Sequence, residues 1–599
     1  MAKSGPRESK RPHVDIAVVG AGIAGLYLAS RLLSEPKYQV KSIALFDTAD
    51  RVGGRILSVF VPEVPYIADL GAMRYLPEQI LTRSIIQNRL QLECSDFTFE
   101  TEGYFLRRKY ISQEAFAAAR AMNPPRNAFP YDVDDSEIGK TPIELIVLSI
   151  QRALRALEMP PGIGDRSEAR LPQKLRDLSE KTCQPNLVTH FTSKEWRLIK
   201  RYGGINGRPL YETTFWDLIQ QFLSREAYNL VYDGSGGYQH LNAADAIVWF
   251  LSDFAGSPYQ TVVGGMGRLV EKLRQEIENR AHSSSNDGLQ VFNLGWNLCE
   301  VQRLAKGKNG LVQLTFTAPE SVSEACEPYR TISATTAILA LPQPALKMIN
   351  FHDFQIERGD SSKHAAQRFN TMLDSVVANP LFKACALYDK PWWRQDRESS
   401  CFRVFTDLPL RQIYHFGPAR QSQASASDDR RSARMIMLFV DARYVHYWKR
   451  LEEIDKANQK SYSRDFEKMM NERSRGEAVG GYGAGNAVLT RVQELLAMVA
   501  GKDVPRSEVL IQKHWHNWPY HTGWHAWTVG ARSWEVSEKL VRPFLDADLF
   551  ICGEAFSGEQ GWIEGALKST ERVLERMGIA SPPSWVDKAE YEKQKELWT

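Results

Sequence analysis

Val14-Asp15-Ile16-Ala17-Val18-Val19-Gly20-Ala21-Gly22-Ile23-Ala24-Gly25 is the stretch that decides the fold. Its first half is a β-branched run typical of a buried strand, and Leu26–Leu33 continues with helical spacing. A second apolar run, Ser42–Phe46, follows and ends in Asp47. The stretch therefore predicts a βαβ unit near the start of the chain.

The glycines at 20, 22 and 25 form a GxGxxG motif that suits a phosphate-binding turn. They permit a tight turn, let the backbone approach a pyrophosphate, and allow the helix to pack close to the strand. The positive end of the helix then faces the phosphates. Glycine-rich turns also occur for steric reasons alone, but Asp47 lies where an acid can bind ribose hydroxyls. Together these features predict a dinucleotide site.

Composition and charge exclude several classes of protein. The chain has 599 residues, of which 43% are hydrophobic, and a formal net charge of +3, so we expect a multidomain globular protein without a nucleic-acid partner. Ile16–Ala29 is shorter than the roughly 20 apolar residues that span a bilayer, and Met1–His13 lacks the apolar core of a signal peptide. Seven scattered cysteines form no CxxC pair. We therefore expect a cytoplasmic protein with no membrane partner.

The pattern along the chain predicts an α/β protein with a discontinuous first domain. Pro77–Leu251 reads as largely helical, with amphipathic stretches such as Phe215–Leu230, and strand-like runs return after Gly264. Runs within Ala384–Phe439 suggest a second sheet, and Ser474–Gly485 a glycine-rich loop. We expect a Rossmann-like dinucleotide-binding domain (12–76, 260–345 and 530–580), an α+β substrate-binding domain (77–125, 231–259 and 346–529), a helical domain (126–230) and a C-terminal tail (581–599).

His521 and His525 have the i,i+4 spacing of metal-binding histidines, within a segment rich in aromatic residues. A zinc site would need a rigid helix there, but Pro519 and Gly523 argue against one. We expect no metal site and interpret the aromatic segment as the border of a ligand pocket.

Arg51-Val52-Gly53-Gly54-Arg55 follows Asp47 almost at once and brings two cations to the same diphosphate. With Gly71-Ala72-Met73-Arg74, Gly264-Gly265-Met266 and the segment Gly553–Ala566, it resembles the flavin amine oxidases, and within them the L-amino acid oxidases of the bacterial and fungal type. The resemblance runs from residue 14 to about 576 and implies FAD as cofactor. Because no cysteine lies between Cys401 and Cys552, noncovalent FAD is expected.

The resemblance also assigns residues to the cofactor. The glycine-rich turn would line the pyrophosphate, Asp47 and Thr48 the ribose, and the turn at Gly71 the flavin ring; Glu554 would otherwise be read as a helix cap. The expected FAD contacts are Gly20, Gly22, Ile23, Ala24, Gly25, Asp47, Thr48, Arg51, Gly54, Arg55, Gly71, Ala72, Met73, Arg74, Leu298, Gly553, Glu554, Gly561, Trp562, Ile563 and Ala566.

In the substrate site, the resemblance implies that Arg74 and Tyr414 bind the α-carboxylate of the substrate, and that Gly561 and Trp562 lie at its amino end. A guanidinium suits the carboxylate because its planar fork can bind two oxygens, although Arg74 could instead pair with a phosphate or an acid. Lys383 sits in an apolar strand-like run, where the family has a catalytic lysine that assists reaction with O2. Strand alternation could equally send Lys383 to solvent.

The resemblance implies oxidation of L-amino acids by O2 and water to 2-oxo acid, ammonia and hydrogen peroxide, in a protein that is commonly a homodimer. Hydride leaves the neutral amine, and no strong protein base is expected. An amino acid 2-monooxygenase, an amine or polyamine oxidase, and a flavin-binding scaffold without turnover remain alternatives. Residues that could line a side-chain pocket are Trp216, Asp233, Gly236, Gly237, Tyr238 and Trp249.

Overall fold

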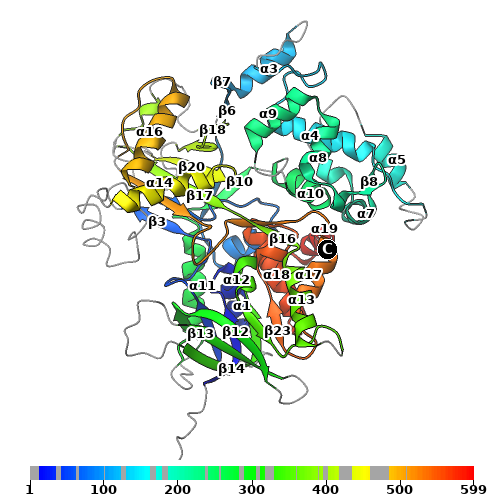
Figure 1. Cartoon of the computed structure of the whole chain (residues 1–599), viewed down its shortest axis with the longest axis vertical. Helices are drawn as coiled ribbons and strands as arrows, with labels where there is room; N and C mark the ends of the chain where they lie inside the picture. The colour runs from blue at the N-terminus through cyan, green and yellow to red at the C-terminus, as the bar shows by residue number, and fades with distance from the viewer. Residues whose placement is uncertain are drawn as a thin grey trace, which may run out of the picture.

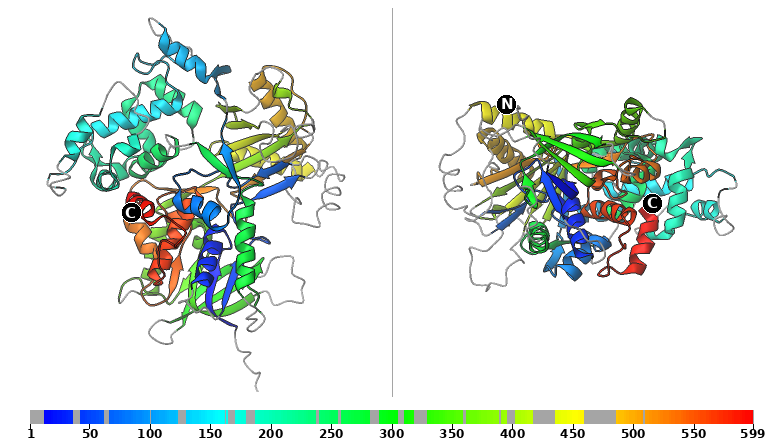
Figure 2. Two further views of the ribbon diagram at one scale, coloured as in Figure 1. Left: turned by 180° about the vertical axis from the view of Figure 1, so that it is seen from behind. Right: turned by 90° about the horizontal axis from the view of Figure 1, so that it is seen from below.

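The computed structural model divides the chain into two sheet-based parts and a helical part, which Figures 1 and 2 show from three sides. It describes all residues except 1–11, 36–41, 62–65, 100, 123–129, 162, 164–169, 179–186, 237–239, 255–257, 282–288, 305–309, 318–328, 359–360, 389, 395–401, 417–434, 459–484, 508 and 599. The predicted pocket residues Gly237 and Tyr238, and most of the predicted loop 474–485, lie outside the described residues.

The first sheet joins strands from three remote parts of the sequence, at the bottom of Figure 1. In spatial order the strands are β11 (Phe292–Leu294), β2 (Ile43–Asp47), β1 (His13–Val19), β14 (Tyr329–Leu339), β13 (Leu311–Thr317), β12 (Asn297–Leu304) and β15 (Asn350–His352), with β23 (Leu549–Ile551) also paired to β14. β1 runs parallel to both of its neighbours. The sheet is therefore assembled from a discontinuous stretch of chain.

Side chains of β1 alternate between two hydrophobic cores. Ile16 and Val18 pack in one core with α1 (Ile23–Ser34), α11 (Gly267–Arg280) and α18 (Ile563–Arg576), while Ala17 and Val19 pack in the other. A parallel strand covered on both faces needs apolar residues at consecutive positions. This requirement explains the continuous apolar run from Ile16 to Val19.

The second sheet lies above the first and faces it with one side. Its order is β21 (Val509–His514), β17 (Leu381–Leu387), β20 (Met435–Asp441), β19 (Gln412–His415), β18 (Phe402–Thr406), β6 (Thr101–Leu106) and β7 (Lys109–Ser112). Helices α14 (Val445–Asn458) and α16 (Asn486–Ala500) pack on the outer face, because Trp448 and Val492 share a core with Phe382 and Leu438. β6 and β7 fall within the segment expected to be largely helical, so that prediction is wrong there.

The helical part packs around α4 (Pro142–Arg155), α7 (Ser193–Tyr202), α8 (Phe215–Phe222), α9 (Arg225–Ser235) and α10 (Ala243–Phe254). The predicted single stretch 215–230 is two helices, because the Ser224 hydroxyl caps α9 by accepting the Ala227 N–H. α10 belongs to the same core through Ile247 and Phe250. The helical part therefore continues past residue 230.

Residues 581–599, expected to be a charged tail, contain helix α19 (Lys588–Trp598). α19 lies against α7, where the Ser193 hydroxyl donates to the Lys593 carbonyl. Among the described residues, no helix is both long and apolar enough to cross a bilayer.

Candidate active site

A cavity of about 300 Å³ opens where the carboxyl ends of β1 and β2 meet the inner face of the second sheet and α10. It brings together most of the residues proposed from the sequence, although they come from remote segments. The proposed residues that line it are Gly20, Gly22, Ile23, Ala24, Asp47, Thr48, Gly54, Arg55, Gly71, Ala72, Met73, Arg74, Lys383, Gly553, Glu554, Gly561, Trp562, Ile563 and Ala566.

Gly25 and Arg51 do not line the cavity but shape its wall. A Cβ added at Gly25 would lie 1.9 Å from the Gly20 carbonyl oxygen, so only glycine lets α1 pack this close to the turn. The Arg51 guanidinium donates to the carbonyl oxygens of Val52, Gly54 and Ile56. Arg51 therefore fixes the loop that carries Gly54.

Leu298 and Tyr414 also lie away from the cavity wall. Leu298 is buried in the core of the first sheet and pairs with Phe316. The Tyr414 hydroxyl donates to Oε1 of Gln412 at 2.6 Å, and Gln412 does line the cavity. The tyrosine thus lies behind the wall and orients a residue that the sequence analysis did not select.

One end of the cavity is built from backbone groups at the start of α1. Gly20 has φ +103°, a conformation that favours glycine, and Gly22 precedes the first turn of α1. A Cβ added at Gly22 would find its nearest atom, Gly54 Cα, 3.7 Å away, so the space above Gly22 is open. Open space at a helix N-terminus fits a phosphate group.

Asp47 ends β2 beside this turn. Its two carboxylate oxygens accept N–H bonds from Ala21 at 2.7 Å and Ala49 at 2.8 Å. Burial raises the pKa of Asp47, and the two N–H bonds oppose that rise. The carboxylate is held rigidly at the cavity wall, as a ribose-binding acid requires.

Glu554 is the centre of a buried ionic group in the middle of the cavity. It pairs with Arg55, accepts a hydrogen bond from the Gly561 N–H at 3.0 Å, and lies 2.5 Å from Nδ1 of His525. The Gln343 N–H donates to Nε2 of His525, so the proton of the neutral ring is on Nδ1 and bonds Glu554. Burial would raise the pKa of Glu554, but Arg55 and His525 outweigh it and hold the pKa below its usual range.

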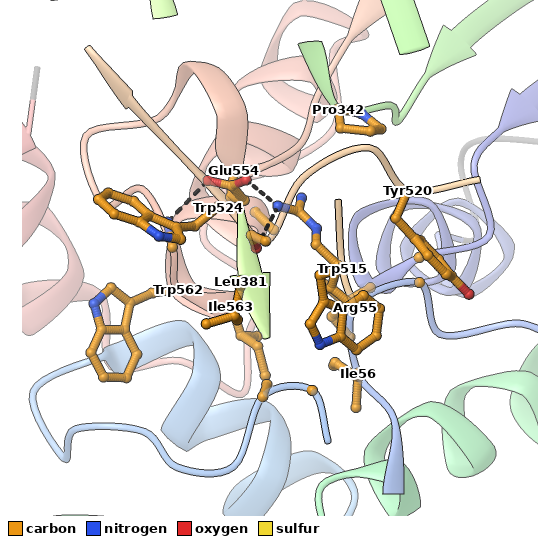
Figure 3. A pocket seen from close by; sticks show the side chains of 18 of the residues that line it. Arg55, Ile56, Pro342, Leu381, Trp515, Tyr520, Trp524, Glu554, Trp562 and Ile563 are labelled. Carbon is orange, nitrogen blue, oxygen red and sulfur yellow. Dashed lines mark hydrogen bonds and ion pairs between the residues drawn. The ribbon is translucent and has the colours of Figure 1, made fainter. Parts of the chain in front are cut away.

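These contacts show that Glu554 does not cap a helix and that His525 is bound to an acid 29 residues away. Figure 3 shows Arg55 reaching toward Glu554, with Trp524 and Trp562 on one side and Trp515 and Tyr520 on the other. All four aromatic residues line the cavity.

Lys383 is buried, with 1% of its surface exposed, and its side chain points to the inner face of the second sheet. Its Nζ donates to the Gly71 carbonyl at 2.6 Å and the Asp69 carbonyl at 3.3 Å. Burial lowers the pKa of Lys383 to about 8, and the charge of Asp69 opposes the change. A titratable cation therefore lies at the cavity wall, bonded to the backbone of Gly71 in the segment that carries Arg74.

Arg74 lines the cavity in the segment that follows Gly71. Its guanidinium carbon is 3.9 Å from the centroid of the Tyr259 ring, and that ring stacks on Trp562 at 6.1 Å. Its Nη1 is buried and has no hydrogen-bond partner among the described residues. A buried guanidinium nitrogen without a partner is costly unless a ligand supplies an acceptor.

Among the cavity residues that the sequence analysis missed are Asp253, Tyr259, Arg403 and Gln412. They come from α10, β10 (Tyr259–Val262), β18 and β19, where no motif marks them. Trp249, proposed as a pocket residue, does line the cavity and stacks on Trp524 at 6.1 Å. Trp216 instead packs in the helical core, and Asp233 accepts a hydrogen bond from Tyr131.

The chain is similar to known proteins over most of its length. The family model described as flavin containing amine oxidoreductase matches residues 23–478. Achacin of Lissachatina fulica is 23% identical over 601 residues, covering 96% of this chain and 94% of achacin. The L-amino-acid oxidase BmooLAAO-I of Bothrops moojeni is 28% identical over 420 residues, covering 69% and 67% of the two chains.

A solved structure of a putrescine oxidase with redesigned cofactor binding matches with a TM-score of 0.58 at 14% identity, covering 95% of this chain and 99% of that one. At this identity the match shows a shared fold. Because the family model spans more than half of the residues, the chain belongs to the flavin containing amine oxidoreductases.

Proposed function

We propose that the protein is an FAD-dependent L-amino acid oxidase, which converts an L-amino acid, O2 and water to a 2-oxo acid, ammonia and hydrogen peroxide. The observation that carries this proposal is Arg74, whose Nη1 is buried at the cavity without a partner. An oxidase for simple amines has no carboxylate to bind and gains nothing from such a group. The similarity to BmooLAAO-I supports the same substrate class.

FAD would occupy the cavity with its pyrophosphate at the Gly20–Gly25 turn, its ribose at Asp47, and its remaining groups along Arg55, Gly71 and Glu554. Bound FAD supplies the acceptor for a hydride from Cα and the site at which O2 is reduced. No cysteine follows Cys401 before Cys552, which supports noncovalent binding. We assign this binding to the predicted Rossmann-like domain, residues 12–76, 260–345 and 530–580, with β15 added at its edge.

Gly22→Ala and Gly25→Ala are expected to separate cofactor binding from folding. The Cβ at position 22 meets nothing closer than 3.7 Å, so Gly22→Ala should fold normally but retain less FAD. At position 25 the Cβ would clash with the Gly20 carbonyl, so Gly25→Ala should destabilise the fold. Overpacking of this kind lowers the free energy of unfolding by about 1–3 kcal/mol. The FAD content of each variant and the thermal unfolding of its apoprotein distinguish loss of cofactor binding from loss of stability. If Gly22→Ala lowered both quantities as much as Gly25→Ala does, the phosphate role of Gly22 would be contradicted.

The substrate would bind with its carboxylate on Arg74 and its amino end near Gly561 and Trp562. Arg74 is held in place by the ring of Tyr259, which stacks on Trp562. Holding both ends of the amino acid orients Cα–H, and orientation of this kind supplies much of the rate. Lys383 lines the same cavity, which supports its assignment as the catalytic lysine that assists the reaction with O2.

Anaerobic mixing of the purified yellow protein with L-amino acids, D-amino acids and simple amines tests the proposal. Loss of flavin absorbance with L-amino acids alone would support it and identify the preferred side chain. Reduction by simple amines alone would favour an amine oxidase, and no reduction would favour a flavin-binding scaffold. Product analysis in air separates 2-oxo acid formation from the amide made by a 2-monooxygenase.

A further inference from the structure

Asp253 is an acid at the cavity to which the proposed chemistry gives no role. It lies near the end of α10, has 7% of its surface exposed, and lines the cavity beside Arg74. Oδ2 accepts a hydrogen bond from the Trp562 indole at 2.8 Å. Within the described part of the chain, Oδ1 has no hydrogen-bond partner. One oxygen is therefore fixed by protein, and the other is available to a ligand.

The position of Asp253 relative to Arg74 is set by two aromatic rings. The Tyr259 hydroxyl donates to the Asp253 carbonyl at 2.8 Å, and the Tyr259 ring lies between Arg74 and Trp562. Trp562 thus binds the side chain of Asp253, and Tyr259 contacts both Arg74 and the Asp253 backbone. The α-amino group of an amino acid is two bonds from its carboxylate carbon. Arg74 is close enough to Asp253 for its charge to act on the Asp253 carboxyl group, and both residues line one cavity, so a carboxylate on Arg74 would place the attached amino group in the part of the cavity that holds Asp253.

The surroundings of Asp253 make its carboxylate a stronger base. Burial raises the pKa of Asp253 well above its usual value, the Trp562 bond and Arg74 oppose the rise, and the nearby Glu559 adds to it. Glu559 is itself paired with Lys568, while Lys383 and Arg403 face the same cavity from the second sheet. Because burial makes the charged carboxylate costly, the ionised form of Asp253 accepts a proton readily from a bound donor.

We propose that Asp253 is a catalytic residue that accepts a proton from the α-ammonium group of the bound amino acid. The step starts from the ionised Asp253 carboxylate, which the charges of Arg74 and of the bound ammonium group stabilise. One N–H bond of the ammonium breaks, an O–H bond forms on Oδ1, and the nitrogen regains its lone pair. The positive and negative charges disappear together, which a buried cavity favours. The inference rests on the proposed function, because hydride can leave Cα only from the neutral amine.

Asp253→Asn in the FAD-loaded enzyme tests this role, because an amide oxygen can still accept the Trp562 hydrogen bond. At pH 7 the rate constant for anaerobic flavin reduction by L-leucine should fall by about 10²- to 10⁴-fold, the range for general base catalysis. The loss should shrink by about tenfold per pH unit as the free ammonium group is titrated at higher pH. A loss that does not depend on pH would overturn the proposal.

A matched control is Asp245→Asn, also on α10, whose acid pairs with Lys200 away from the cavity. Its pH profile should follow the wild type. A second measurement uses 4-methylpentanoate, a carboxylate without an amino group, and follows its binding by the flavin spectrum. Asp253→Asn should keep that affinity; weaker binding would show that Asp253 only positions Arg74 and would overturn the proposal.

The substrate panel completes the test. A defect confined to L-lysine and L-arginine would assign Asp253 to a side-chain ammonium and also overturn the proposal. If the wild type is not reduced by any L-amino acid, the proposed function itself fails. If the wild type is reduced and the variant has an unchanged pH profile, only the role of Asp253 fails.

Discussion

Arg74→Met is expected to lower kcat/KM for L-amino acids by between about 30- and 5000-fold, the equivalent of about 2–5 kcal/mol for losing a buried charged hydrogen bond. The reason is that Nη1 of Arg74 is buried at the cavity and has no hydrogen-bond partner among the described residues. Methionine keeps the apolar stem over the Tyr259 ring but cannot bind a carboxylate. Oxidation of the matching simple amines should not fall, and steady-state peroxide formation measures both.

Arg107→Met provides the matched control for Arg74. Arg107 also stacks on a tyrosine, 3.8 Å from the centroid of Tyr131, but it does not line the cavity. Its variant should keep the wild-type preference for L-amino acids over amines. If Arg74→Met loses activity equally toward amino acids and amines, the guanidinium supports the pocket and does not read the carboxylate.

Local sequence patterns predicted those site residues whose position is fixed within one continuous segment of the chain. The turn at Gly20–Gly25 needs a strand before it and a helix after it, and both are legible from hydrophobic spacing. The same holds for Asp47, which ends the next strand. Lys383 was recognisable as a charge in an apolar run, but its direction depends on which face of the sheet meets the first sheet. Cys385, two residues on, shares the inner core with Met73, whereas Phe382 belongs to the outer core.

Residues that sheet pairing brings to the cavity could not be predicted in this way. Arg403 is placed by the parallel pairing of β18 with β6, which lies some 300 residues earlier in the chain and supplies Glu102 as its ion-pair partner. Asp253 depends on how the end of α10 meets Trp562. Leu298 was selected by its strand position alone, and its pairing with Phe316 carries it into the core.

Lys383→Met is expected to lower the rate constant for reaction of the reduced enzyme with O2 by about 10²- to 10⁴-fold, while anaerobic reduction by amino acid changes little. A buried ammonium beside the cavity stabilises negative charge that develops when O2 gains electrons. Because burial lowers the pKa of Lys383 to about 8, the charged form is lost as the pH rises through that value. The wild-type O2 reaction should therefore slow above pH 8, and stopped-flow oxidation should show no such step in the variant.

Lys513→Met separates the effect of the position of Lys383 from the effect of its charge. Lys513 on β21 lies directly opposite Lys383 on β17 in the strand register. Burial also lowers the pKa of Lys513 to about 8, yet Lys513 lies over the Trp515 and Tyr520 rings and does not line the cavity. Its variant should keep both the O2 rate constant and the step near pH 8. Equal losses in the two variants would contradict a specific role for Lys383, since they would show that the reaction depends on the total positive charge of the strand pair.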